Sequence, residues 1–140
     1  MFFAQQQCVY AASQQSRSIV PQHASKDKHR WVLGSFSLSV DNEVSVIEFD
    51  EDSGNLECVA HYAHRDRIWC METSPMDSSL LVTSHQDKSL SNGVSLFRMP
   101  GQRIEEIEGS GKDGNGWTGE LVDLDFLKSI EKTGAEKRDS

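Results

Sequence analysis

The feature that most constrains this sequence is an internal repeat with a period of 50 residues. Residues 42–49 (NEVSVIEF) match residues 92–99 (NGVSLFRM), with Asn, Val and Ser recurring identically and the apolar positions recurring in kind. Upstream, residues 32–35 (VLGS) fall at the same offset from residues 82–85 (VTSH). Each copy therefore has the same order of an apolar strand, a polar loop and an alternating strand.

The segments between these matches also have the pattern of short strands separated by turns. Residues 56–62 and 68–73 are apolar or alternating, and residues 50–55 and 74–75 between and after them are rich in turn formers. Repeats of roughly 40–50 residues with about four strands each are typical of a β-propeller. We therefore expect an all-β fold, an incomplete propeller of about two blades plus part of a third.

The sequence divides into three expected regions, of which the first two cover residues 1–101. Residues 1–29 are an irregular lead, in which the apolar piece at residues 8–12 is a candidate first strand. Residues 30–101 hold the two blade-like repeats.

The third region, residues 102–140, is Gly-rich and acidic. Within it, residues 119–126 resemble the strand at residues 67–73 and could begin a third blade. The alternative is a short helix, because Leu121, Leu124 and Leu127 share a face at helical spacing. Both interpretations remain open from the sequence.

Composition excludes several classes of partner. Fourteen Lys and Arg residues against 22 Asp and Glu residues give a formal net charge of −8. An acidic chain lacks the broad basic surface that phosphate backbones and anionic membranes attract. No apolar run is long enough to span a membrane. The three cysteines, without a secretory signal, predict a reduced, intracellular protein.

Five motifs of this sequence occur in the same order as in the EARP and GARP complex-interacting protein family, and the sequence resembles that family. Its members are WD40-repeat proteins of endosomal traffic. The similarity covers roughly residues 8–101 and depends on order and spacing more than on any one motif. The motifs are LGSFSL at 33–38, DNEV at 41–44, His64 followed by Ile68-Trp69, SPMD at 74–77 and VSLFRMP at 94–100.

The resemblance implies a non-enzymatic scaffold or adaptor for endosomal tethering complexes in endosome-to-Golgi retrieval and endocytic recycling. Such a protein would be cytoplasmic and peripherally associated with endosomes or the trans-Golgi network. A seven-bladed ring takes about 350 residues, so we expect an N-terminal fragment or truncated form. The alternative is a truncated isoform that is non-functional or acts as a competitor.

The resemblance also implies structural roles for individual residues. The Trp-Asp pair of WD40 repeats is replaced by Phe97-Arg98, and the usual Gly-His pair by Ala63-His64. His64 would hydrogen-bond within a blade, with Asp87 as the candidate partner. Trp117, in a Gly-rich segment, is either an exposed interface anchor or a loop plug. The expected blade positions are His64, Trp69, Pro75 and Phe97.

The sequence carries no convincing catalytic or metal site. Cys58, His61, His64 and Cys70 are ligand types that zinc accepts, so a small Cys/His metal-binding domain is a further alternative. However, residues 58, 61 and 64 alternate faces in an extended chain, and the long loop of ordinary zinc modules is missing. Nucleophile-elbow, phosphate-loop and calcium-loop patterns are not matched. We therefore expect no enzyme, no cofactor and no metal.

Overall fold

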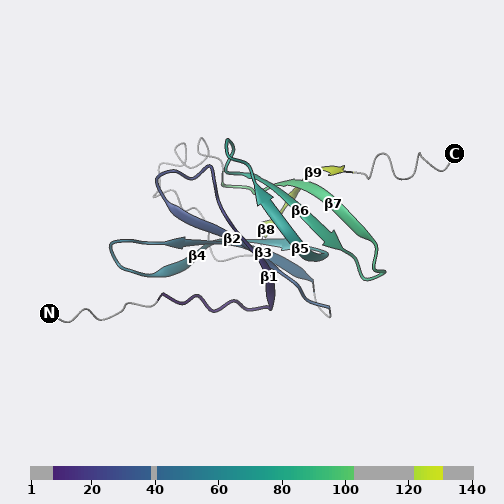
Figure 1. Cartoon of the computed structure of the whole chain (residues 1–140), viewed down its shortest axis with the longest axis horizontal. Coiled ribbons are helices and arrows are strands. Elements are labelled where there is room, and N and C mark those ends of the chain that lie inside the picture. Colours follow the sequence, from purple (N-terminus) through teal and green to yellow (C-terminus); the bar gives the residue numbers. More distant parts are fainter. Residues whose placement is uncertain (1–7, 39–40, 103–121, 131–140) are drawn as a thin grey trace.

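The computed structural model describes residues 8–38, 41–102 and 122–130, and every regular element among them is a β-strand (Figure 1). The strands are β1 (Ser16–Pro21), β2 (His29–Ser35), β3 (Asn42–Phe49), β4 (Leu56–His64), β5 (Arg67–Thr73), β6 (Leu80–Gln86), β7 (Asn92–Arg98), β8 (Val122–Asp123) and β9 (Asp125–Ile130).

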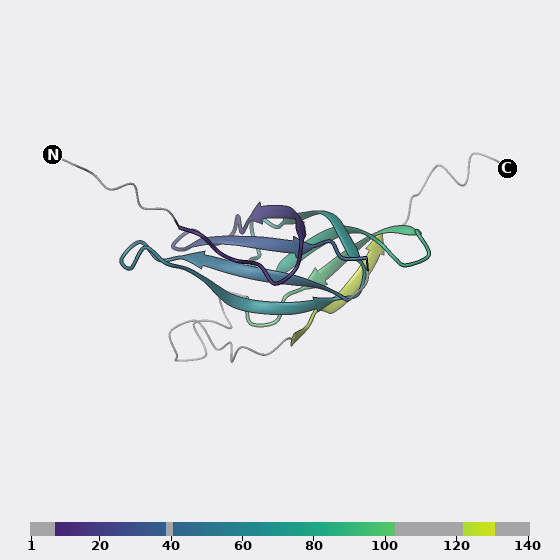
Figure 2. The ribbon, with the colours of Figure 1, turned by 90° about the horizontal axis from the view of Figure 1, so that it is seen from below.

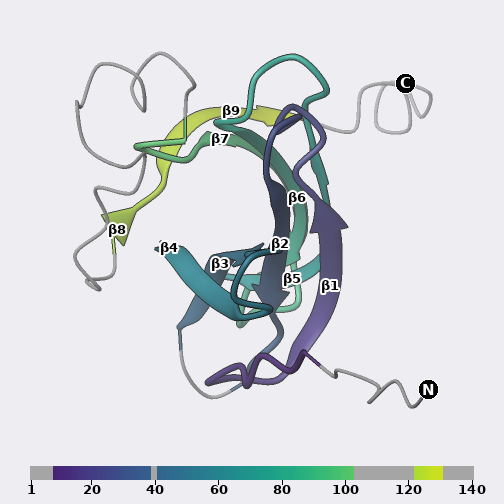
Figure 3. The same ribbon diagram turned by 90° about the vertical axis from the view of Figure 1, so that its left-hand side faces the viewer.

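These strands form two twisted sheets, each built around four antiparallel strands. The first has the order β1-β2-β3-β4, with the two-residue β8 added in parallel beside β4. The second has the order β5-β6-β7-β9. In Figure 3 the strand β1 lies beside β5, and these two strands bring the sheets into contact. The expected all-β, partial-propeller architecture is confirmed.

The 50-residue repeat corresponds to one hairpin that occurs once in each sheet. Gly34 pairs with Val44 in the first sheet, and Ser84 pairs with Val94 in the second, so the two hairpins share the same register. Asn42 and Asn92 begin the second strand of each hairpin. The repeat in sequence is thus a repeat of strand pairing.

The core lies between the two sheets. Because side chains alternate along a strand, one face of each sheet is apolar and turned toward the other sheet. Gly34 allows a close approach there, since a β-carbon at this position would lie 2.9 Å from Ile68 Cγ2. The buried cluster comprises Val32, Val44, Val46, Val59, Ala60, Tyr62, Ile68, Met71, Leu81 and Met99.

The first strand lies later in the chain than the apolar piece at residues 8–12. Residues 8–15 contain no strand, and β1 instead spans Ser16–Pro21, where it pairs with β2. Only alternate side chains of β1 are even partly buried. Because the strand buries so little, its sequence does not need the run of apolar residues by which a strand is recognised. Pairing with β2, rather than hydrophobicity, defines this strand.

The C-terminal strand completes the second sheet and does not open a third one. β9 pairs antiparallel with β7, as Figure 2 shows for the yellow strand beside the green one. The described part of the 119–126 segment is therefore strand, and the helical alternative is wrong for residues 122–130. Periodicity cannot identify which sheet edge a short strand will join, and here the free edge of β7 accepts it.

Candidate functional site

His64 is held at the junction between the two sheets by two hydrogen bonds. It ends β4, and only 4% of its surface is exposed. Its Nδ1 lies 2.8 Å from the Asp66 carbonyl oxygen and its Nε2 lies 2.9 Å from the Thr83 hydroxyl. A carbonyl only accepts, so Nδ1 carries the proton and Nε2 accepts from Thr83. Burial lowers the pKa of His64 to about 4, which keeps the ring neutral.

A second histidine extends this junction. His85 Nδ1 lies 2.9 Å from an Asp66 carboxylate oxygen, and its Nε2 lies 2.8 Å from the Ser95 hydroxyl. The His64 and His85 rings meet edge to face at 5.6 Å. Asp66 therefore contacts both histidines, one through its carbonyl and one through its carboxylate.

The partner expected for His64 is not the one in the structure. The Asp87 carboxylate accepts the backbone N–H groups of Ser89 and Ser91 at 2.8 and 2.9 Å, which closes its own turn. Asp66 contacts His64 instead because it lies only two residues away in the tight β4–β5 connection. His85 was not among the residues that the sequence predicted for this site, although it occupies the same position in the repeat as Ser35, and that equivalence was a usable signal.

The other expected blade positions occupy different environments. Phe97, half-buried on β7, packs against the His64 ring at 5.2 Å. Trp69 on β5 packs edge to face against Phe36 at 4.8 Å. Pro75 is exposed in the connection between β5 and β6. Trp117 lies outside the described residues.

The four Cys and His residues of the zinc alternative do not share a site. Cys58 donates to the Ala60 carbonyl, and His61 lies 2.6 Å from the Glu43 carboxylate. His64 is buried at the junction of the sheets, whereas Cys70 is exposed on β5 in the other sheet. Within the described part of the chain, no group of three His, Cys, Asp or Glu side chains could hold a metal ion.

A polar groove lies at one end of the two sheets. The β2–β3, β4–β5 and β6–β7 connections meet there around a hollow of about 330 Å³. Its charged lining residues are Asp41, Arg65, Asp66, Arg67, Asp87 and Lys88. We call this hollow the loop-end groove.

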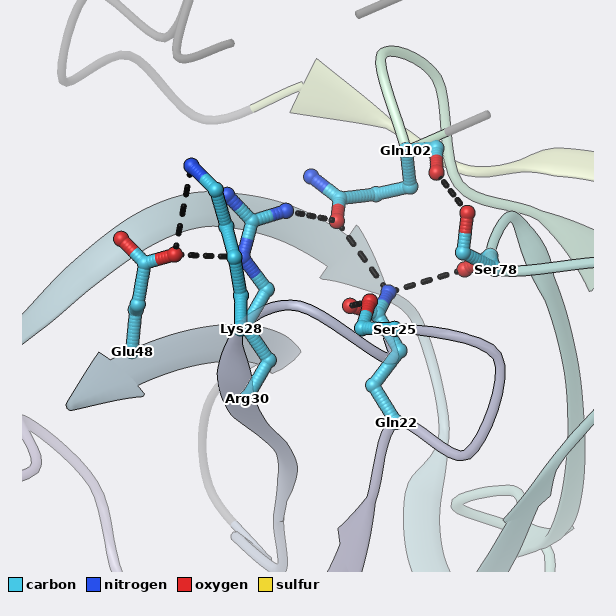
Figure 4. A network of polar contacts seen from close by, with 7 residues as sticks. All are labelled: Gln22, Ser25, Lys28, Arg30, Glu48, Ser78 and Gln102. Carbon is cyan, nitrogen blue, oxygen red and sulfur yellow. Dashed lines mark hydrogen bonds and ion pairs between the residues drawn. The ribbon is translucent and has the colours of Figure 1, made fainter. Parts of the chain in front are cut away.

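A buried polar network joins the sheets at the opposite ends of the strands (Figure 4). Gln102 Oε1 accepts hydrogen bonds from Gln22 Nε2 at 3.2 Å and from Arg30 at 3.3 Å. Gln22 Nε2 also donates to the Ser78 carbonyl at 2.9 Å. The Arg30 guanidinium, which is buried, pairs with Glu48 at 3.1 Å. This network fixes the first sheet against the end of the second repeat.

No helix among the described residues is long and apolar enough to cross a membrane.

Comparison with known proteins agrees with this architecture. The profile of the family described as the EIPR1 beta-propeller matches residues 4–111. EARP and GARP complex-interacting protein 1 of Homo sapiens is 28% identical over 121 residues, covering 83% of this chain and 30% of that protein. The protein of the same name in Rattus norvegicus is 31% identical over 97 residues, covering 66% of this chain and 25% of that protein.

A plant protein shares the similarity. WD repeat-containing protein DWA2 of Arabidopsis thaliana is 26% identical over 91 residues, covering 65% of this chain and 26% of that protein. The chain thus spans less than a third of the length of these curated relatives. With more than half of its residues matched by the family profile, the chain belongs to the EIPR1 beta-propeller family and carries part of its propeller.

Proposed function

We propose that this chain is the part of a non-enzymatic propeller adaptor that helps to recognise the EARP and GARP tethering complexes. The adaptor would act in endosome-to-Golgi retrieval and endocytic recycling. The observation that supports the proposal most directly is the family match over residues 4–111, together with relatives that are named for interaction with these two complexes. The place of action would be the cytoplasm, at the surface of endosomes or the trans-Golgi network.

The architecture suits recognition without chemistry. Two sheets packed through one core give a rigid body, and rigid propeller blades present their connecting loops to partners. The two histidines at the junction of the sheets are engaged with neighbouring hydroxyl groups, His64 with that of Thr83 and His85 with that of Ser95. These side chains hold strands together, which leaves the loops to make contacts.

A direct capture experiment tests the proposal. The immobilised 140-residue chain is incubated with purified EARP and, separately, with purified GARP complex. We expect at least one complex to be retained. The control is Val46→Asp, which places a charge in the buried core and should abolish both folding and capture. A chain that is folded by circular dichroism yet retains neither complex would contradict the proposal.

A further inference from the structure

We propose that the face of the second sheet that is turned away from the first sheet binds the same face of a second copy of this chain. We call it the outer face. Strand pairing and the alternation of side chains along each strand place seven residues on it: Cys70, Glu72, Val82, Ser84, Val94, Leu96 and Lys128. This inference concerns self-association, goes beyond the proposed adaptor function and does not depend on it.

The internal repeat identifies part of the outer face as a surface of the kind that this chain buries. Its three aliphatic residues, Val82, Val94 and Leu96, occupy the repeat positions of three first-sheet residues, which are Val32, Val44 and Val46. The first-sheet residues are 0% exposed, because the second sheet packs over them. Their equivalents on the outer face are only half-buried. The aliphatic surface that forms the interface inside the chain thus recurs on the outer face, partly open to solvent.

The size of the outer face predicts a weak dimer. Its strands are six or seven residues long. Neighbouring strands lie about 4.8 Å apart and rise about 3.3 Å per residue, so the face covers roughly 400 Å². A contiguous apolar face of this size typically marks an interaction surface. It is about half of what each partner contributes to a standard protein interface, so association should depend on concentration.

The charges at the margins make the outer face complementary to itself. Glu72 pairs with Val82, Val82 with Leu96, and Leu96 with Lys128, so one row crosses the sheet from a carboxylate to an ammonium group. The Glu72 side chain is exposed and also lies 3.1 Å from His23 Nε2. A two-fold axis parallel to the strands reverses the row in the second copy. Each Glu72 then lies opposite Lys128 of the other copy, with aliphatic side chains against each other between them.

The first sheet does not offer an open face for a head-to-tail contact. Its surface away from the core includes Ile47, which is only 5% exposed. The residues that precede β1 lie over this surface: Tyr10 is hydrogen-bonded to Cys58, and Gln14 Nε2 donates to the Asp41 carbonyl at 3.1 Å. These residues occupy the place that the next copy in a head-to-tail chain would need. Association through two outer faces, which closes at two copies, is therefore favoured.

Sedimentation equilibrium of the 140-residue chain tests this inference. Between about 1 and 300 μM we expect a monomer–dimer equilibrium with a dissociation constant on the order of 10–100 μM. Leu96→Lys places a charge in the middle of the interface and should raise this constant by about tenfold or more. The matched control is Ile19→Lys, at a 57% exposed residue of β1, which should dimerise within about twofold of the original chain. Circular dichroism establishes that each variant is folded.

A charge exchange gives a second test at residues whose replacement leaves the core untouched. Glu72 and Lys128 are both exposed. Glu72→Lys or Lys128→Glu alone should weaken the dimer by about threefold or more, because each places like charges opposite each other. The variant with both changes keeps the net charge of the original chain and should regain its dissociation constant within about twofold.

Three results would overturn the inference. The first is a chain that stays monomeric over the whole concentration range. The second is a dimer that withstands Leu96→Lys in a folded variant, or that the charge exchange fails to restore. The third is a series of species larger than a dimer that Ile19→Lys abolishes, because that result would assign the contact to the first sheet in a head-to-tail arrangement.

Discussion

At His64, burial couples the protonation of one ring to the stability of the fold. The pKa is about 4 in the folded chain and 6.5 in the unfolded chain, so between these values the unfolded state binds more protons. Stability from this group is therefore present above about pH 6.5 and is lost as the pH falls toward 4. The full effect is up to roughly 3 kcal/mol.

Urea unfolding at pH 7 and pH 4.5, followed by tryptophan fluorescence, measures this effect. His64→Gln should be less stable at pH 7, because the bonds to Asp66 and Thr83 are disturbed, but its stability should change less between the two pH values. His23→Gln, at an exposed site, should keep the pH response of the original chain. An unchanged response in His64→Gln would assign the effect to other groups.

Cysteine reactivity is a second residue-scale property that the structure predicts. Burial raises the pKa of the half-buried Cys58 thiol. Tyr10 is hydrogen-bonded to this thiol, and burial raises the pKa of Tyr10 to about 12. Cys8 and Cys70 are exposed. Since the thiolate is the reactive form, a variant retaining only Cys58 should react with Ellman's reagent at pH 8 more slowly than one retaining only Cys70. Equal rates would contradict the covered position of Cys58.

The residue scale is also where the sequence was least informative. The resemblance to the family identified His64 as a bonded residue, yet its partners Asp66 and Thr83 depend on how β4 turns into β5 and meets β6. Asp87 was chosen as the partner because a blade histidine usually pairs with an aspartate of the same blade. In the structure, however, the Asp87 carboxylate accepts backbone N–H groups of its own turn. Hydrogen-bond partners follow from geometry that spacing alone does not fix.

At the scale of elements, the repeat predicted the β2–β3 and β6–β7 hairpins because paired strands with one register must carry similar patterns. It did not predict β1 or the place of β9. Both are edge strands with little buried surface, and their positions come from the strand edges that β2 and β7 offer. Local pattern identifies strands that bury a face and misses strands that complete a sheet.

The packing of β2 against β5 gives an element-scale prediction. Gly34→Ala places a β-carbon 2.9 Å from Ile68 Cγ2 and 3.0 Å from the Met71 side chain. We expect a loss of about 1–3 kcal/mol in the free energy of unfolding, because overpacking displaces core side chains. Met71→Ala should make room, so the double variant should lose less than the sum of the two single variants. Additive losses would show that the clash is relieved elsewhere.

At the scale of the whole molecule, two sheets share one core and one buried polar network. The sequence predicted two blade-like repeats because the repeat counts them, whereas the expected start of a third blade is β9, which joins the second sheet in the described residues. It did not predict the network, because Gln22, Arg30 and Gln102 lie far apart in the chain and resemble solvated residues. Only the approach of the two sheets buries them together.

The network should make the two sheets unfold as one unit. Gln102→Ala would leave the buried donors of Gln22 and Arg30 without their shared acceptor, at a cost of about 1–3 kcal/mol. Far-ultraviolet circular dichroism, which follows both sheets, and tryptophan fluorescence, which follows Trp31 on β2 and Trp69 on β5, should report coincident transitions. In Gln102→Ala both transitions should move to lower urea together, while Gln86→Ala, at a half-buried position away from the network, should change them by less than about 0.5 kcal/mol. If the probes separate in the original chain, the sheets are independent units and the network does not couple them.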